Sequence, residues 1–198
     1  SGRKFAQLRY GENPHQEGSI YINEEDIGLR KLRGKNLSYN NYNDIFSGLE
    51  ILSSFKKPGT VIIKHANPSG VSINGSPLKS FEESYKCDPI SAFGGVVACN
   101  FKINETLARK MSSIFFEVIL FKGIDKKALK IFGNKKNLTL VDISKFKIKK
   151  NQQIKYFDNA FLLQDKNHKI IENKKIKFVT KLKPTKKELN NAEFAFNI

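Results

Sequence analysis

Apolar and polar positions along residues 1–143 predict short buried strands that alternate with amphipathic helices. Four apolar runs read as strands, being short, rich in β-branched or aromatic residues and bounded mostly by turn residues: 61–63, 96–99, 115–121 and 138–141. Between them, apolar residues recur at helical spacing and predict helices that begin near four positions: Asn43, Pro77, Asn104 and Asp125. Asn43 is the expected cap of the first helix. This alternation indicates a layered α/β sheet.

The strand predicted over 61–63 ends in two ionisable residues, Lys64 and His65, and a segment containing Pro68 and Gly70 follows. We expect this segment to be a loop that turns the chain away. In an open α/β sheet, ligands bind beyond the carboxyl ends of the strands, which places the pair at the lip of a crevice. Histidine titrates near neutral pH and lysine can stabilise an anion. The alternative is a strand that simply ends in two solvated residues.

Two turn-rich segments and one carboxylate add candidate binding groups. Arg9 can make two parallel hydrogen bonds to a phosphate or carboxylate, and Tyr10 can stack on a planar ring. Gly94 and Gly95 precede a buried strand and allow a ligand to approach the backbone. Glu117 interrupts an apolar run and needs a partner, because an unpaired buried charge is costly. The alternatives are an N-terminal arm pinned by surface hydrogen bonds and an ordinary tight turn.

The periodicity weakens over 144–184, an irregular lysine-rich extension with strands predicted at 161–163 and 177–180. Thr185 and Glu188 form the pattern of a capping box and predict a helix. This helical pattern reaches the last residue without a terminator, so we expect a fragment of a longer chain. The expected organisation has three parts, a core lobe, an extension and the start of a helix: 1–143, 144–184 and 185–198.

Charge and cysteine content narrow the class of protein. The net charge is +16, and residues 101–198 carry 23 basic and 9 acidic groups. Only five of the basic residues are arginines, whereas nucleic-acid readers rely on arginine forks and stacking platforms. A solvated lysine-rich face is therefore favoured over nucleic-acid binding, with attraction of small anions as a third possibility. Two cysteines and the absence of an apolar run of about 20 residues favour a cytoplasmic protein without membrane segments.

Several chemistries find no signature in the sequence. It contains no Gly-x-Gly-x-x-Gly, Walker A or Gly-x-Ser-x-Gly motif. The two cysteines and three histidines lack the spacing of a zinc site, including the His-x-Glu and Pro-Cys-x-x-Cys pair of zinc deaminases. The remaining inventory is a metal-free site of lysine, histidine, an Arg-Tyr loop and a glycine-lined strand. Such a site suits transfer to or from an amine.

Seven segments in register resemble one family, the transformylase domain of the bifunctional AICAR formyltransferase/IMP cyclohydrolase enzymes. They are LRYGENPHQ (8–16), GKNLSYNN (34–41) with Asp44, IKHANPSG (63–70), DPISAFGG (88–95), FEVI (116–119), KKNL (135–138) and FVTKLKPT (178–185). The resemblance covers the whole of this chain, but this chain corresponds to only about the first half of that domain.

This resemblance implies transfer of a formyl group from 10-formyltetrahydrofolate to the 5-amino group of AICAR, giving FAICAR in purine biosynthesis. His65 matches the catalytic base and Lys64 the residue that stabilises the transition state. Six residues match substrate-binding positions: Arg9, Tyr10, Asn67, Phe93, Gly94 and Glu117. The family fold is a three-layer, zinc-free α/β/α lobe like that of cytidine deaminases. Its active sites form across a homodimer and need no metal, nucleic acid or membrane.

The chain departs from the family pattern at Ser69, at Phe121-Lys122 and at Asn159-Ala160, where cysteine, Ala-Pro and Gly-Gly are usual. The second lobe and the cyclohydrolase domain lie outside this sequence. We therefore expect the chain alone to bind AICAR weakly and to turn over little or nothing. Two alternatives from other classes are a lysine-rich RNA-binding module and a relative of the zinc deaminases.

Overall fold

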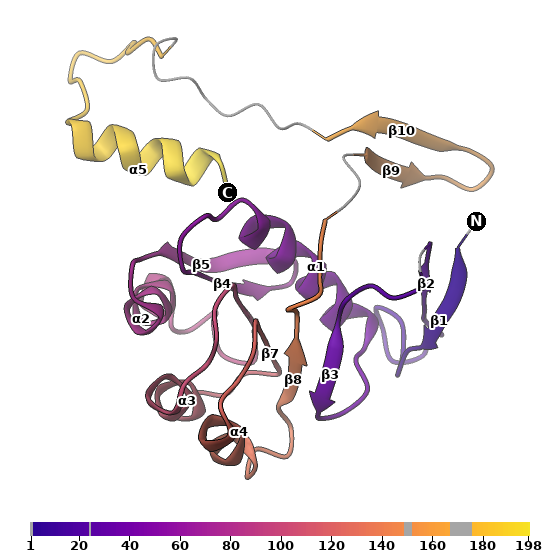
Figure 1. Ribbon diagram of the computed structural model, residues 1–198. Coiled ribbons are helices and arrows are strands. Elements are labelled where there is room, and N and C mark those ends of the chain that lie inside the picture. The colour runs from indigo at the N-terminus through magenta and orange to yellow at the C-terminus, as the bar shows by residue number, and fades with distance from the viewer. Residues whose placement is uncertain (1, 24, 149–151, 167–175) are drawn as a thin grey trace. The chain divides into compact units, whose positions relative to one another are not determined.

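The computed structural model describes residues 2–23, 25–148, 152–166 and 176–198, and the chain divides into two compact units, 1–148 and 149–198 (Figure 1). The first unit contains, in order, β1 (Arg3–Gln7), β2 (Ser19–Ile22), β3 (Arg30–Arg33), α1 (Tyr39–Ser53), β4 (Gly59–Lys64), β5 (Asn67–Ile73), α2 (Pro77–Cys87), β6 (Val96–Cys99), α3 (Glu105–Ser112), β7 (Val118–Phe121), α4 (Lys126–Phe132) and β8 (Thr139–Asp142). The second contains β9 (Gln152–Tyr156), β10 (Phe161–Asp165) and α5 (Lys186–Phe196).

A mixed six-stranded sheet with the order β3-β8-β7-β6-β4-β5 forms the centre of the first unit. Strands β6, β7 and β8 are parallel, whereas β4 runs antiparallel to both β5 and β6. Ile63, near the end of β4, therefore pairs with Val96 at the start of β6. The expected position of Lys64 beside the carboxyl ends of neighbouring strands is wrong. It lies at the edge where the parallel strands begin.

Helices cover both faces of this sheet, which gives three layers (Figure 1). On one face, Ile62 and Val97 pack with side chains of α2, α3 and α4, such as Phe81. On the other face, Val61 and Ile63 pack with side chains of α1. The side chains of residues 61–63 are fully buried, so the predicted burial of this strand on both faces is confirmed.

Local sequence signals predicted several boundaries correctly. Helix α2 begins at Pro77 after Ser76, and α3 follows Asn104, whose side chain accepts a hydrogen bond from the Leu107 amide. The predicted cap at Asn43 is wrong. The cap is Ser38, five residues earlier, and it forms a capping box with Asn41 that satisfies two backbone amides at once.

The structure corrects two more predictions near the strand end. The expected loop after residue 66 is strand β5, in which Gly70 pairs with Ile62. The strand predicted over 115–121 is shorter, and Glu117 lies immediately before it rather than inside it.

Over residues 152–166 and 176–198, the second unit contains a two-stranded antiparallel hairpin and one helix. The hairpin pairs β10, which was predicted in part, with β9, which was not. Residues 177–180 form no strand, so that prediction is wrong. Helix α5 follows the predicted capping box of Thr185 and Glu188. None of the described helices is long and apolar enough to cross a membrane.

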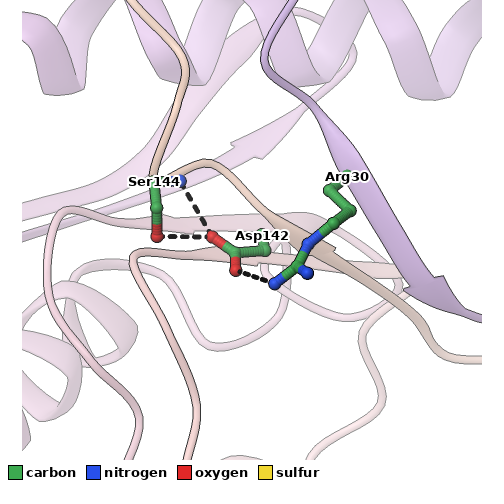
Figure 2. A network of polar contacts seen from close by, with 3 residues as sticks. All are labelled: Arg30, Asp142 and Ser144. Carbon is green, nitrogen blue, oxygen red and sulfur yellow. Dashed lines mark hydrogen bonds and ion pairs between the residues drawn. The ribbon is translucent and has the colours of Figure 1, made fainter.

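A polar network links the edge strand β3 to β8, as Figure 2 shows. Asp142 accepts hydrogen bonds from the Arg30 guanidinium at 2.8 Å and from both the amide and the hydroxyl of Ser144 at 2.8 and 2.6 Å. Burial alone would raise the pKa of Asp142, but the Ser144 donors, followed by Arg30, lower it below the ordinary value.

We expect Asp142→Asn to reduce the free energy of unfolding by about 1 kcal/mol at pH 7. The folded-state pKa lies below the unfolded one, so the contribution is complete above about pH 4 and disappears as the pH falls through the folded value. Urea titrations at pH 7 and pH 3 measure the difference. Arg30→Gln should cost less, because the Arg30 side chain is itself 72% exposed to solvent. A deficit in Asp142→Asn that is independent of pH would contradict this expectation.

Candidate functional site

Lys64 and His65 lie at a strained turn. Strands β4 and β5 are joined by two residues, His65 and Ala66, with φ of 53° and 61°. Two positive φ values are typical of a type I′ hairpin turn, which normally contains Asn-Gly. Among the described residues, these are the only non-glycine residues with positive φ. Each such residue costs on the order of 1–2 kcal/mol, so the surrounding structure must hold the turn.

Lys64 is half-buried against the loop that precedes β6. Its ammonium Nζ donates a hydrogen bond of 3.1 Å to the carbonyl oxygen of Phe93. Next to that carbonyl, Gly94 has a φ of +69°, and its amide donates to the Phe115 carbonyl at 2.9 Å. A Cβ at Gly94 would lie 3.1 Å from Lys64 Nζ. The glycine thus permits both the turn and the close approach of the lysine.

Glu117 has the partner that its position requires, although this partner is an amide rather than a cation. Glu117 is half-buried, and its Oε2 accepts a hydrogen bond of 2.9 Å from Asn41 Nδ2. Asn41 Oδ1 in turn accepts from the Ser38 amide at 3.1 Å, which fixes the orientation of the side-chain amide. The capping box of α1 therefore positions a donor that holds the Glu117 carboxylate.

Asp44 lies three residues after Asn41 and on the same face of α1. Its Oδ1 accepts a hydrogen bond of 2.6 Å from the Ala66 amide. Burial raises the pKa of Asp44 and the Glu117 charge adds to this, whereas the Ala66 amide and the charges of His65 and Lys64 oppose it. Two carboxylates, one ammonium and one imidazole thus share this edge of the sheet.

Neither Asn41 nor Asp44 is among the site residues predicted from the sequence, although both belong to a segment that carries the family resemblance. Asn41 lies in the polar, turn-rich stretch 34–42, and the expected cap at Asn43 puts the helix start too late for Asn41 to face the sheet. The available signal was Ser38 followed three residues later by Asn41. That spacing marks a helix start and puts Asn41 and Asp44 on adjacent turns facing one way.

Arg9 and Tyr10 form a separate arm beside the start of α1. Arg9 donates to the Tyr10 hydroxyl at 3.0 Å, and its guanidinium carbon lies 4.8 Å from the centre of that ring. The arm is attached by backbone hydrogen bonds between Arg9 and Leu37 and between Tyr10 and Tyr39. In the part of the chain described, no hydrogen bond joins this arm to Lys64 or His65.

The last two predicted site residues, Asn67 and Phe93, are both exposed. The Asn67 side-chain amide donates to the His65 carbonyl at 2.9 Å, so it is engaged within the turn. The Phe93 ring is 63% exposed and tilts against Phe115 with ring centres 5.1 Å apart. A hollow of about 380 Å³ opens beside these rings, between the segments that precede β7 and β8.

Together these groups can bind a polar, planar molecule and move a proton. An exposed imidazole can accept a proton, and a half-buried ammonium can stabilise a developing negative charge. The Glu117 carboxylate, fixed by Asn41, can accept hydrogen bonds from a ligand. Among the described residues, no group of three or more His, Cys, Asp or Glu side chains is placed to hold a metal ion.

We expect Gly94→Ala to displace the Lys64 ammonium and to strain the loop. The added Cβ meets Lys64 Nζ at 3.1 Å, and alanine is disfavoured at a φ of +69° by about 1 kcal/mol. The chain should therefore lose roughly 1 kcal/mol of stability in urea titrations, and the NMR signals of the Lys64 side chain should shift. Gly75→Ala is the matched control, because a Cβ there meets nothing within 4 Å. Unmoved Lys64 signals in Gly94→Ala would contradict this geometry.

Comparison with known proteins places the chain in context. The sequence profile of the family described as AICARFT/IMPCHase bienzyme matches residues 1–198. Two relatives carry the name bifunctional purine biosynthesis protein PurH. The one from Buchnera aphidicola subsp. Schizaphis graminum is 41% identical over 98% of this chain, and the one from Aquifex aeolicus is 38% identical over 99% of it. In both cases the chain spans only 39% of the relative's length. A solved structure of Acinetobacter baumannii RibD gives a TM-score of 0.39 at 13% identity, covering 52% of this chain and 35% of that one.

Proposed function

Because this chain belongs to the AICARFT/IMPCHase bienzyme family, we propose that it forms part of an AICAR transformylase acting in purine biosynthesis. The substrates are AICAR and 10-formyltetrahydrofolate, and the product is FAICAR. The curated relatives named above are purine biosynthesis proteins of greater length. The observation that carries the proposal is the meeting of Lys64, Gly94 and Glu117 at one edge of the sheet, beside the turn that presents His65.

In the proposed reaction, His65 removes a proton from the 5-amino group of AICAR. The amine nitrogen then forms a bond to the formyl carbon, and the bond from that carbon to the folate N10 breaks as N10 takes up a proton. The Lys64 ammonium stabilises the negative charge that develops on the formyl oxygen. Its hydrogen bond to the Phe93 carbonyl already holds this ammonium at the edge of the sheet.

The remaining matched residues bind the nucleotide in this proposal. Glu117 accepts hydrogen bonds from the polar groups of AICAR, and Gly94 lets the base approach the backbone. The exposed ring of Phe93 offers a stacking surface. Asn67, whose side-chain amide donates to the His65 carbonyl, lies at the turn beside the catalytic pair. Arg9 and Tyr10 bind the phosphate and ring in a site that is shared across a homodimer.

The fold-level part of the proposal is that the first unit is a cytidine-deaminase-like lobe working without zinc. Its core extends over 1–143, followed by an extension over 144–184 and by a helix that leads toward a second lobe. The three layers around the six-stranded sheet support this assignment. The lysine-rich surface attracts anionic substrates rather than RNA, and the protein is cytoplasmic.

The test is a transformylase assay on two samples, this chain alone and a polypeptide extended to the full length of the relatives. Both receive AICAR and 10-formyltetrahydrofolate, and the formation of FAICAR is followed. We expect turnover by the extended polypeptide and little or none by the chain alone. An extended, folded polypeptide that forms no FAICAR would overturn the proposed activity. Turnover by the chain alone at the same rate would overturn the requirement for the second lobe.

A further inference from the structure

The peptide unit between His65 and Ala66 is held on both of its polar groups by side chains. Its N–H donates to Asp44 Oδ1 at 2.6 Å, and its C=O accepts from Asn67 Nδ2 at 2.9 Å. This is the central peptide of the β4–β5 turn. We propose that Asp44 is a positioning residue that, together with Asn67, fixes the orientation of this peptide and so aims the His65 side chain.

The orientation of a central turn peptide selects between two kinds of hairpin turn. With both central φ values positive the turn is type I′, whereas type II′ needs a positive φ only at the first position. Rotating the peptide between His65 and Ala66 would interconvert the two. It would also release Ala66 from a left-handed conformation that alanine adopts rarely.

The residues of the turn do not by themselves favour the observed type I′ conformation. Histidine is tolerated in the left-handed region, but Ala66 has no side chain to stabilise that conformation, and glycine is the usual residue there. The preference must therefore come from outside the turn. Asp44 supplies it from helix α1, whose position is fixed by the Ser38–Asn41 capping box and by burial of Ile45 and Leu49.

Asp44 lies on the helix that also holds the candidate site residue Glu117. The same face of α1 presents Asn41 to Glu117 and Asp44 to Ala66, so one helix holds both the carboxylate and the turn. Any movement of the turn relative to α1 would change the distance between His65 and Glu117. The role assigned to Asp44 in catalysis rests on the proposed function, whereas its role in the turn does not.

Solution NMR on this chain tests the structural part. In the wild type, the amide protons of His65 and Ala66 should be close, giving a strong NOE, and the Ala66 amide should exchange slowly. In Asp44→Ala, we expect that NOE to weaken and exchange of the Ala66 amide to accelerate at least tenfold. Asp44→Asn keeps an acceptor oxygen and should retain the wild-type pattern.

A rescue variant keeps the test decisive if Asp44→Ala also loses stability. Ala66→Gly removes the penalty for positive φ, because glycine adopts that conformation freely. The double variant Asp44→Ala/Ala66→Gly should therefore regain the wild-type NOE pattern. If the turn keeps its pattern in folded Asp44→Ala, or if the double variant fails to regain it, the inference is overturned.

The catalytic part is tested in the extended polypeptide. We expect Asp44→Ala to lower kcat roughly 10- to 100-fold with little change in KM, since small displacements of a catalytic group have effects of this size. The added Ala66→Gly change should recover most of the loss. An inactive wild type would count against the proposed function alone, because the NMR result would still stand. An active wild type with unchanged kcat in Asp44→Ala would overturn the positioning role.

Discussion

Replacing His65 with alanine should lower kcat of the extended enzyme by roughly 10²- to 10⁴-fold, the range typical of losing a general base. The amine of AICAR is a poor nucleophile, so the proposed reaction needs a base that removes its proton. His65 is exposed at the tip of the β4–β5 turn, next to Lys64 and within the electrostatic reach of Asp44. It is therefore free to contact a substrate rather than being used in the core.

Lys64→Ala gives the complementary loss, because it removes the charge that stabilises the developing oxyanion. Both variants should retain part of the affinity for AICAR, since Glu117 and Gly94 are untouched. Steady-state kinetics and equilibrium binding separate the two effects. Lys79→Ala, at an exposed position on α2, is a matched control that should leave both unchanged. Turnover of His65→Ala within threefold of wild type would exclude this histidine as the base.

Gly70→Ala should destabilise the first unit by about 3 kcal/mol, near the upper end of typical overpacking costs. A Cβ at Gly70 would lie 1.9 Å from the Ser84 carbonyl oxygen, which belongs to the backbone of helix α2. No side-chain rotation can relieve this clash, so α2 and β5 must separate. The hydrogen bond of 2.9 Å from the Ser84 hydroxyl to the Gly70 carbonyl would be disturbed as well.

The loss is measured by urea or thermal unfolding of the chain and compared with that of Gly75→Ala. That control adds the same methyl group at a site where it meets nothing within 4 Å, so its stability should stay within about 0.5 kcal/mol of wild type. Equal stabilities of the two variants would show that α2 does not pack on β5 as closely as described. Strand β5 also carries one side of the His65 turn, so destabilisation here should broaden the signals of the site.

The elements that local signals could predict are those with strong periodicity and clear boundaries. Helix α2 was predicted from Ser76 and Pro77, and β6 from an apolar run after two glycines, because these features act over a few residues. The β4–β5 hairpin could not be predicted in this way. Its turn sequence, His65-Ala66, lacks the Asn-Gly signal and is held by a side chain 22 residues away.

Several candidate residues named from the sequence lie together in the structure, although their role in binding or catalysis stays a prediction. Lys64, His65, Gly94 and Glu117 were all named as candidates, and the structure brings them to one edge of the sheet. The edge itself was wrong, because strand direction depends on pairing between distant segments rather than on local pattern. Antiparallel pairing of β4 with β6 puts the end of one strand beside the start of the other. The contact between Asn41 and Glu117 could not be predicted for the same reason, since the two residues are 76 positions apart, although the Ser38–Asn41 spacing indicates the start of the helix.

Titrating the isotope-labelled chain with AICAR tests the central claim most directly, because it needs neither the second lobe nor turnover. We predict saturable shifts at the Lys64 side chain, the His65 ring and the amides of Gly94 and Glu117, with the β9–β10 hairpin unaffected. His65→Ala should leave the shifts of Gly94 and Glu117 in place. Saturable binding that moves signals elsewhere while these four stay unchanged would contradict the assignment of this sheet edge as the nucleotide site.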